Sequence, residues 1–222
     1  MFEREILGTE KNNKSFWDRY ARFYDFEILG FNGSAYAEMY KLMSRVFTKD
    51  MQVLEVATGT GIIAANIAGF VCSVEAVDFS PKMIKTAEKR KGLPENVSFS
   101  VEDATALSFA DNTFDAAIIS NALHIMPNPI GALANIKRVL KPGGLLIAPT
   151  YAHGLLKESS WNLSAAILNA IGFETYARWL PEEYLAFIEE NGFRVENWRM
   201  LQAAFPLVYL EAHLSNGVDG SE

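Results

Sequence analysis

Acidic side chains stand at the ends of three consecutive strand-like segments of this sequence. Glu55 lies just before two glycines, Asp78 ends a second apolar segment, and Asp103 follows a third. Because the carboxyl ends of parallel strands meet at one edge of a sheet, where open α/β sheets bind ligands, we expect these carboxylates to line one pocket. A carboxylate about 20 residues after a glycine-containing turn can accept hydrogen bonds from both hydroxyls of a ribose. The spacing therefore predicts a nucleoside site.

The turn between the first strand and its helix reads Glu-Val-Ala-Thr-Gly-Thr-Gly over residues 55–61. Gly59 and Gly61 permit backbone conformations and close ligand approach that a Cβ would obstruct. The turn contains no lysine or arginine, which suits a nucleoside without phosphates. The same glycines, continued to Ala64, also fit the alanine-ended dinucleotide fingerprint, although Glu55 would tend to repel a pyrophosphate. A dinucleotide site is therefore a second interpretation of this turn.

Predicted strands and helices alternate along most of the chain, and they must position the acidic residues. Short runs rich in β-branched residues predict strands, whereas apolar residues three and four positions apart predict helices. Pro81 and Pro129 follow the N-cap residues Ser80 and Asn128 and mark helix starts. We expect strands at residues 53–57, 73–78, 97–101, 114–120 and 145–148, and helices at residues 15–29, 36–47, 62–68, 81–91, 128–140, 161–179 and 181–190.

The end of the chain departs from this alternation. Residues 193–200 and 205–210 resemble two strands with too few residues between them for a crossover helix, so they should pair antiparallel. The pattern predicts an α/β fold with a doubly wound, mostly parallel Rossmann-like sheet, flanked by helices and ending in an antiparallel hairpin. We expect helices of residues 1–48 to form a lid or cap over a ligand-binding core of residues 49–222, with a helical insertion at 155–180 that binds a second substrate.

Charge and composition exclude several classes of partner. The formal net charge of −7 over 222 residues argues against sequence-independent binding to nucleic acid or to an anionic membrane surface. Cys72 is the one cysteine, so no disulfide forms within the chain. No segment reaches the roughly 18 uninterrupted apolar residues of a membrane span, and the start lacks a secretory pattern. The sequence therefore predicts a cytoplasmic protein.

Several motifs in a fixed order resemble those of the class I S-adenosylmethionine-dependent methyltransferases. The similarity is strongest to the small-molecule branch, which includes enzymes of ubiquinone and menaquinone biosynthesis, and it covers residues 20–144. No single motif identifies the family, but their order and spacing are specific. The motifs lie at residues 53–61, 77–83, 102–104, 114–117 and 138–144.

The resemblance implies that Glu55 and the loop after it hold the methionine part of S-adenosylmethionine. That loop contains Ala57, Thr58, Gly59 and Gly61. The family usually has glycine where this chain has Ala57, so we expect the loop to tolerate a methyl group there. An acidic pocket suits the cofactor, because its sulfonium and ammonium groups are positive.

The resemblance also assigns residues to the nucleoside. Asp78 would hold the ribose, and Phe79 and Met83 would flank the adenine. Asp103 would accept a hydrogen bond from the adenine amino group, and the Ala104 backbone would donate one to the ring. These roles come from the family and not from the spacing alone.

Three further residues are assigned to the cofactor site by the same resemblance. Asn121, just past the fourth strand, would lie near the methionyl end. Tyr20 and Tyr24, in the helices before the first strand, would belong to a lid, or would only fill a helix interface. No metal ligand set is expected, and the product would be S-adenosylhomocysteine.

Methyl transfer needs little from the protein beyond alignment of the reactants in a dry pocket. If the acceptor must lose a proton, His124, shortly after the fourth strand, is the candidate base, and otherwise it packs as a loop residue. His153 follows the fifth strand and is a weaker candidate, whereas His213 is expected on the surface.

The acceptor is expected to be a small molecule. Apolar residues at helical spacing over 161–179 would suit a flat or apolar acceptor better than a nucleic acid or protein. Two other functions stay open beside the methyltransferase: an NAD(P)-dependent oxidoreductase, and a module that senses S-adenosylmethionine without turning it over.

Overall fold

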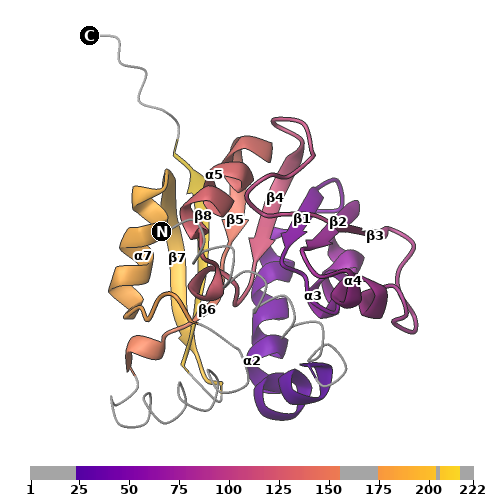
Figure 1. Cartoon of the computed structure of the whole chain (residues 1–222), viewed down its shortest axis with the longest axis horizontal. Helices are drawn as coiled ribbons and strands as arrows, with labels where there is room; N and C mark the ends of the chain where they lie inside the picture. Colours follow the sequence, from indigo (N-terminus) through magenta and orange to yellow (C-terminus); the bar gives the residue numbers. More distant parts are fainter. Residues whose placement is uncertain (1–23, 156–174, 204–205, 216–222) are drawn as a thin grey trace, which may run out of the picture.

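The chain folds around one mixed β-sheet with helices on both faces (Figure 1). The computed structural model describes residues 24–155, 175–203 and 206–215. Within them the sheet has eight strands. Seven follow the order β3-β2-β1-β4-β5-β8-β6, and the eighth, β7, pairs with β8 along the edge opposite β5 and β6. The strands are β1 Gln52–Val56, β2 Ser73–Asp78, β3 Val97–Val101, β4 Phe114–Ile119, β5 Leu140–Ile147, β6 Thr150–Tyr151, β7 Phe193–Leu201 and β8 Leu207–Leu214.

Parallel pairing joins the five strands β3, β2, β1, β4 and β5, and the remaining pairs are antiparallel. The strand order reverses between β1 and β4, because the chain first builds outward to β3 and then returns to the other side of β1. The predicted doubly wound sheet with an antiparallel hairpin at its end is confirmed. Ligands of such sheets bind beyond the carboxyl ends of the strands at this reversal.

Helices and short 3-10 turns connect the strands. They are α2 Tyr24–Val46, α3 Ile62–Ile67, η1 Ala68–Phe70, α4 Pro81–Ala87, η2 Leu123–Ile125, α5 Pro129–Val139, η3 His153–Leu155 and α7 Pro181–Glu190. The predicted caps hold: Ser80 Oγ accepts from the Met83 N–H at 3.2 Å, and Asn128 Oδ1 accepts from the Gly131 N–H at 2.9 Å. These caps satisfy amides that the first turn of a helix leaves without partners. None of the helices in the described residues is long and apolar enough to cross a membrane.

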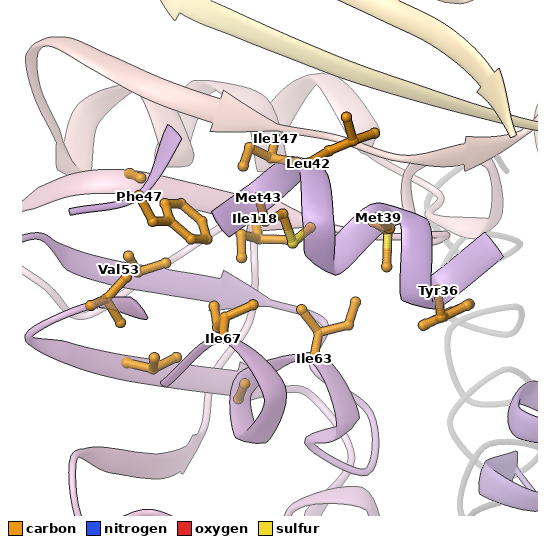
Figure 2. Close-up of a cluster of buried hydrophobic side chains, with 14 of the residues drawn as sticks. Tyr36, Met39, Leu42, Met43, Phe47, Val53, Ile63, Ile67, Ile118 and Ile147 are labelled. Carbon is orange, nitrogen blue, oxygen red and sulfur yellow. The ribbon is translucent and has the colours of Figure 1, made fainter. Parts of the chain in front are cut away.

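Two layers of buried apolar side chains cover the two faces of the sheet. On one face, α2 and α3 pack on β1 and β4, with Met39, Met43 and Ile63 fully or nearly fully buried (Figure 2). On the other face, α5 and α7 pack on β4, β5 and β8 through residues such as Leu133 and Tyr184. Burial of each such side chain contributes about 1.5–3 kcal/mol, so these layers fix the strands and with them the strand ends.

The first helices differ from the prediction. We expected separate helices at 15–29 and 36–47, with a break near Gly33, but α2 runs without interruption from Tyr24 to Val46. A glycine inside a helix costs only about 1 kcal/mol. The buried side chains that follow it, from Tyr36 to Met43, outweigh that cost. Residues 15–23 lie outside the described part of the chain.

Other element boundaries also differ from the predicted ones. The fifth strand begins at Leu140 and not at Leu145, since Leu140 already pairs with Phe114 of β4. The fourth helix ends at Ala87 and not near Lys91. The short strand β6 was not predicted, and residues 175–180, expected to end a helix, are irregular. The rest of the expected 161–179 helix falls on 156–174, outside the described residues.

Candidate functional site

The predicted site residues Glu55, Asp78 and Asn121 come together at the carboxyl edge of the sheet. Glu55 is the penultimate residue of β1, Asp78 ends β2, and Asn121 follows β4. Since β1 lies between β2 and β4 in parallel register, the three tips are neighbours. This is the point where the strand order reverses, as expected for a ligand site in such a fold.

Asp78 connects the glycine loop to the end of β2 through a hydrogen bond. Its Oδ2 accepts from the Gly59 N–H at 2.8 Å, and its Oδ1 accepts from the Ser80 N–H at 2.9 Å. The side chain is 5% exposed. Each carboxylate oxygen can accept a further hydrogen bond, so Asp78 can hold its loop and a pair of ligand hydroxyls together.

The glycine loop turns through left-handed backbone conformations. Ala57 has φ 56°, Gly59 φ 58° and Gly61 φ 73°. A Cβ at Gly61 would lie 2.7 Å from the Phe99 ring and 3.0 Å from Ala87 Cβ, so only glycine fits there. Ala57 departs from the family glycine and holds a positive φ that costs a residue with a Cβ about 1–3 kcal/mol.

We therefore expect Ala57→Gly to raise the free energy of unfolding by about 1 kcal/mol, because strain relief exceeds the extra chain entropy of glycine. Urea denaturation would measure it. The matched control is Ala65→Gly in α3, where the helical backbone carries no such strain and the same change should lower stability by about 0.5–1 kcal/mol. Destabilisation by both changes would show that Ala57 is not strained.

Glu55 is a buried carboxyl, 2% exposed, whose Oε2 accepts from Thr58 Oγ1 at 2.7 Å. Burial raises the pKa of Glu55 to about 8, and the negative charge of Asp78 adds to the rise, while the Thr58 hydrogen bond and the Arg90 charge oppose it. The group is therefore mostly protonated at neutral pH. A cation placed beside it would favour the carboxylate form.

Asn121 carries a buried acceptor just past the neighbouring strand, β4. Its Oδ1 is buried without a hydrogen-bond partner among the described residues, and its Nδ2 donates to Tyr36 Oη at 3.3 Å. The residue has a positive φ of 52°. Burial raises the pKa of Tyr36, and the nearby Glu55 charge adds to it, so Tyr36, Asn121 and Glu55 share one environment. An orphaned carbonyl at this edge of the sheet suits a ligand that donates hydrogen bonds.

The residues assigned to the adenine lie along the tips of β2 and β3. Phe79 is 38% exposed, Met83 is buried in the first turn of α4, and Ala104 is half-buried. Asp103 is exposed, and its Oδ1 accepts from the backbone and hydroxyl of Thr105, both at 2.8 Å. Since Val101 pairs with Asp78, Asp103 lies two residues beyond that pairing, past the end of β3.

The lid residues are only partly described. Tyr24 begins α2, and nothing of its side chain is described, whereas Tyr20 lies outside the described residues. The lid of residues 1–48 and the acceptor-binding insertion at 155–180 therefore stay predictions. Sequence reasoning missed Tyr36, because its helical spacing with Met39 and Tyr40 made it a core residue and gave no sign of the bond to Asn121.

An aromatic and imidazole cluster lies next along the same edge. The ring of His124 lies edge-on to His153 at 5.1 Å and to Tyr151 at 6.4 Å between centroids, and its Nδ1 lies 3.0 Å from Thr150 Oγ1. Burial lowers the pKa of His124 to about 3 and that of His153 to about 4. Both imidazoles are therefore neutral at physiological pH. The unpredicted strand β6 supplies Thr150 and Tyr151.

The third histidine lies far from this cluster. His213 Nδ1 lies 2.8 Å from the Gly143 carbonyl oxygen, at the amino ends of the strands. A cavity of about 300 Å³ opens beside it, lined by Val46, Met51, Asp115, Gly143, Leu145, Glu196, Asn197, Glu211 and His213. It contains none of the strand-tip residues. Among the described residues, no group of histidine, cysteine and acidic side chains could hold a metal ion.

Comparison with known proteins places the matched region over these strand tips. Residues 54–148 match the family model described as a methyltransferase domain. A demethylmenaquinone methyltransferase of Renibacterium salmoninarum is 43% identical over 102 residues, which are 46% of this chain and 42% of that protein. The one from Staphylococcus aureus strain MRSA252 is 36% identical over 102 residues, 45% of this chain and 42% of that protein. The matches span about two fifths of these relatives' length.

Solved structures extend the likeness of the fold. A methyltransferase of Haloferax volcanii, in complex with the Trm112 methyltransferase activator, superposes with a TM-score of 0.73 at 18% identity, over 90% of this chain and 98% of that one. A Thermotoga maritima protein described as an S-adenosylmethionine-dependent methyltransferase gives 0.71 at 18% identity, over 90% and 99%. The chain thus has the fold of these methyltransferases, and it resembles the menaquinone-biosynthesis enzymes in its central motifs.

Proposed function

We propose that this chain is an S-adenosylmethionine-dependent methyltransferase that acts on a small aromatic acceptor. The observation that carries the proposal is a set of groups at neighbouring strand ends: the buried carboxyl of Glu55 in β1, the orphaned carbonyl oxygen of Asn121 just past β4, and a glycine loop bonded to Asp78. The 43% identity to a demethylmenaquinone methyltransferase over 102 residues supports it.

The residues at the strand tips fit the charge of the cofactor. S-adenosylmethionine supplies a methyl group on a positively charged sulfur and also carries an ammonium group. Glu55 and Asn121 Oδ1 can accept the hydrogen bonds of an ammonium group, and its charge would compensate the buried carboxylate. A pyrophosphate brings neither hydrogen-bond donors for these two acceptors nor a positive charge for the carboxylate, which disfavours a dinucleotide.

The nucleoside half would be held by side chains already in position. Asp78 would accept from the ribose hydroxyls while it keeps its two backbone bonds. Phe79, exposed at the tip of β2, offers a ring to one face of the adenine, and Asp103 offers an acceptor to its amino group. Nothing in this arrangement requires movement of the sheet, so the protein would contribute chiefly alignment and exclusion of water.

The acceptor would lie against the imidazole cluster. His124, Tyr151 and His153 present neutral rings at edge-to-face and tilted angles, which suit a flat aromatic molecule. The relatives named above are demethylmenaquinone methyltransferases, whose names indicate a quinone acceptor. We infer an aromatic acceptor of that kind, and a cytoplasmic location as the sequence predicts.

The test is calorimetric titration with S-adenosylmethionine, S-adenosylhomocysteine and NADH, followed by incubation with reduced quinones and release of S-adenosylhomocysteine as the readout. We expect the first two ligands to bind and NADH not to bind. Binding of NADH alone would favour the oxidoreductase. Tight binding of the methyl donor without turnover on any acceptor would favour a sensing module.

His124 is expected to affect turnover and not cofactor binding. With a pKa of about 3 it is a weak base, so we expect it to orient the acceptor through Nε2 while Thr150 holds Nδ1. We expect His124→Ala to lower kcat by roughly 10–100-fold, below the full effect of a general base. The affinity for S-adenosylmethionine should change less than twofold, and an unchanged kcat would contradict the role.

A further inference from the structure

Arg90 reaches back from the end of α4 to the glycine loop. Its Nε and Nη2 donate to the Thr60 carbonyl oxygen at 3.2 and 2.9 Å, and Nη2 lies 3.4 Å from Thr60 Oγ1. Residues 88–91 form a charged run just past α4, and Glu88 and Lys89 are exposed. Arg90 is half-buried.

The loop that Arg90 contacts is tightly enclosed. Thr60 is fully buried, and at Gly61 a side chain would collide with Phe99 of β3 and Ala87 of α4. The helix α4 thus packs on the loop through Ala87, and Arg90, just past the end of the helix, bonds to the same loop. The ribose-side and methionine-side parts of the site are joined at this contact.

The Arg90 charge also acts on the buried carboxyl. It lowers the pKa of Glu55, against the larger effect of burial. The other charged or titratable groups that face Glu55 are Asp78 from β2, which raises its pKa, and Tyr36 from α2. Arg90 is the cation in this group.

We infer that Arg90 is a positioning residue for the cofactor: its guanidinium fork fixes the Thr60 carbonyl, and with it the loop that receives the methionine part. The inference rests on the proposed function. Lysine would keep the charge at this position but cannot direct two parallel N–H groups at one carbonyl. The two contributions of Arg90, geometry and charge, can therefore be separated by substitution.

The experiment compares Arg90→Lys and Arg90→Gln with Lys89→Gln, the exposed neighbour, as control. Calorimetry with S-adenosylmethionine should show a roughly tenfold weaker Kd for both Arg90 variants and less than a twofold change for the control. In turnover, we expect KM for the cofactor to rise while kcat changes little. The pH profile of binding should shift upward in Arg90→Gln only, because Arg90→Lys retains the charge.

The outcomes separate the inference from the proposed function. A wild-type protein that does not bind S-adenosylmethionine defeats the proposed function. If the wild type binds S-adenosylmethionine and Arg90→Lys binds it with the same Kd, the positioning role of Arg90 is overturned and the proposed function stands. If circular dichroism shows that Arg90→Gln does not fold, the Kd of the conservative variant Arg90→Lys still tests the role of Arg90. Equal pH profiles in all variants that fold would overturn the charge contribution.

Discussion

Replacing Asp78 by alanine is expected to weaken the binding of S-adenosylmethionine by at least about 100-fold. The change removes the ribose acceptor and also leaves the Gly59 and Ser80 N–H groups without their partner. A hydrogen bond to a charged group contributes about 1.5–3 kcal/mol, and 1.4 kcal/mol corresponds to a tenfold change in affinity, so the lost bonds to two ribose hydroxyls account for the expected effect. Isothermal titration calorimetry on the purified chain measures the effect directly.

Asp78→Asn keeps the size of the side chain and tests whether both of its backbone hydrogen bonds need a carboxylate oxygen. The amide oxygen can still accept one backbone N–H, but the amide nitrogen would face the other, so we expect an affinity loss close to that of alanine. Asp111→Ala is the matched control, because its carboxylate forms an exposed ion pair with Arg138 at 2.8 Å in the loop before β4, at the opposite end of that strand from Asn121. Wild-type affinity in Asp78→Ala would exclude this pocket as the cofactor site.

Most of the sheet could be predicted because local pattern and tertiary role agree there. The runs at 73–78 and 97–101 are short, apolar and bounded by turn residues, and both match the observed strands. The prediction failed where packing outweighs local preference: α2 continues through Gly33, and β6 consists of Thr150 and Tyr151 alone. A two-residue strand depends on its partner β8, which no window of sequence reveals.

The site residues also fall into two groups: those that local sequence predicts, and those whose role depends on contacts with distant residues. Asp78 could be predicted because strand ends and the glycine turn are local features of the chain. Tyr36 and Arg90 could not, since their hydrogen bonds join residues 85 and 30 positions apart in the sequence. A tyrosine in an apolar helical stripe and an arginine in a charged run look the same whether or not they reach the site.

The binding of S-adenosylmethionine is expected to strengthen as the pH rises from about 6 to 7.5, by up to about tenfold per pH unit. Burial raises the pKa of Glu55 to about 8, so the free protein holds a proton there that a cationic ligand must displace. Binding should therefore release a proton, which calorimetry in buffers of different ionisation enthalpy would detect. His124 and His153 titrate well below this range.

Stability should respond to pH in the opposite sense. The pKa of Glu55 is higher in the folded chain than its ordinary value of 4.5, so the unfolded chain releases this proton first. The contribution of Glu55 to the free energy of unfolding is thus complete below about pH 4.5 and is lost as the pH rises toward about 8. Glu55→Gln removes the titrating group and should flatten both profiles, with weaker cofactor binding throughout.

The opposite pH dependences of cofactor binding and of stability test one cause, the ionisation of Glu55. A carboxyl kept protonated by burial must cost folding stability as it ionises, and the same ionisation must favour a positively charged ligand. Unfolding by urea and binding by calorimetry, both followed over this pH range in wild type and Glu55→Gln, would reveal the link. Profiles that keep their wild-type slopes in Glu55→Gln would assign the titration to another group and remove the charge argument for the cofactor.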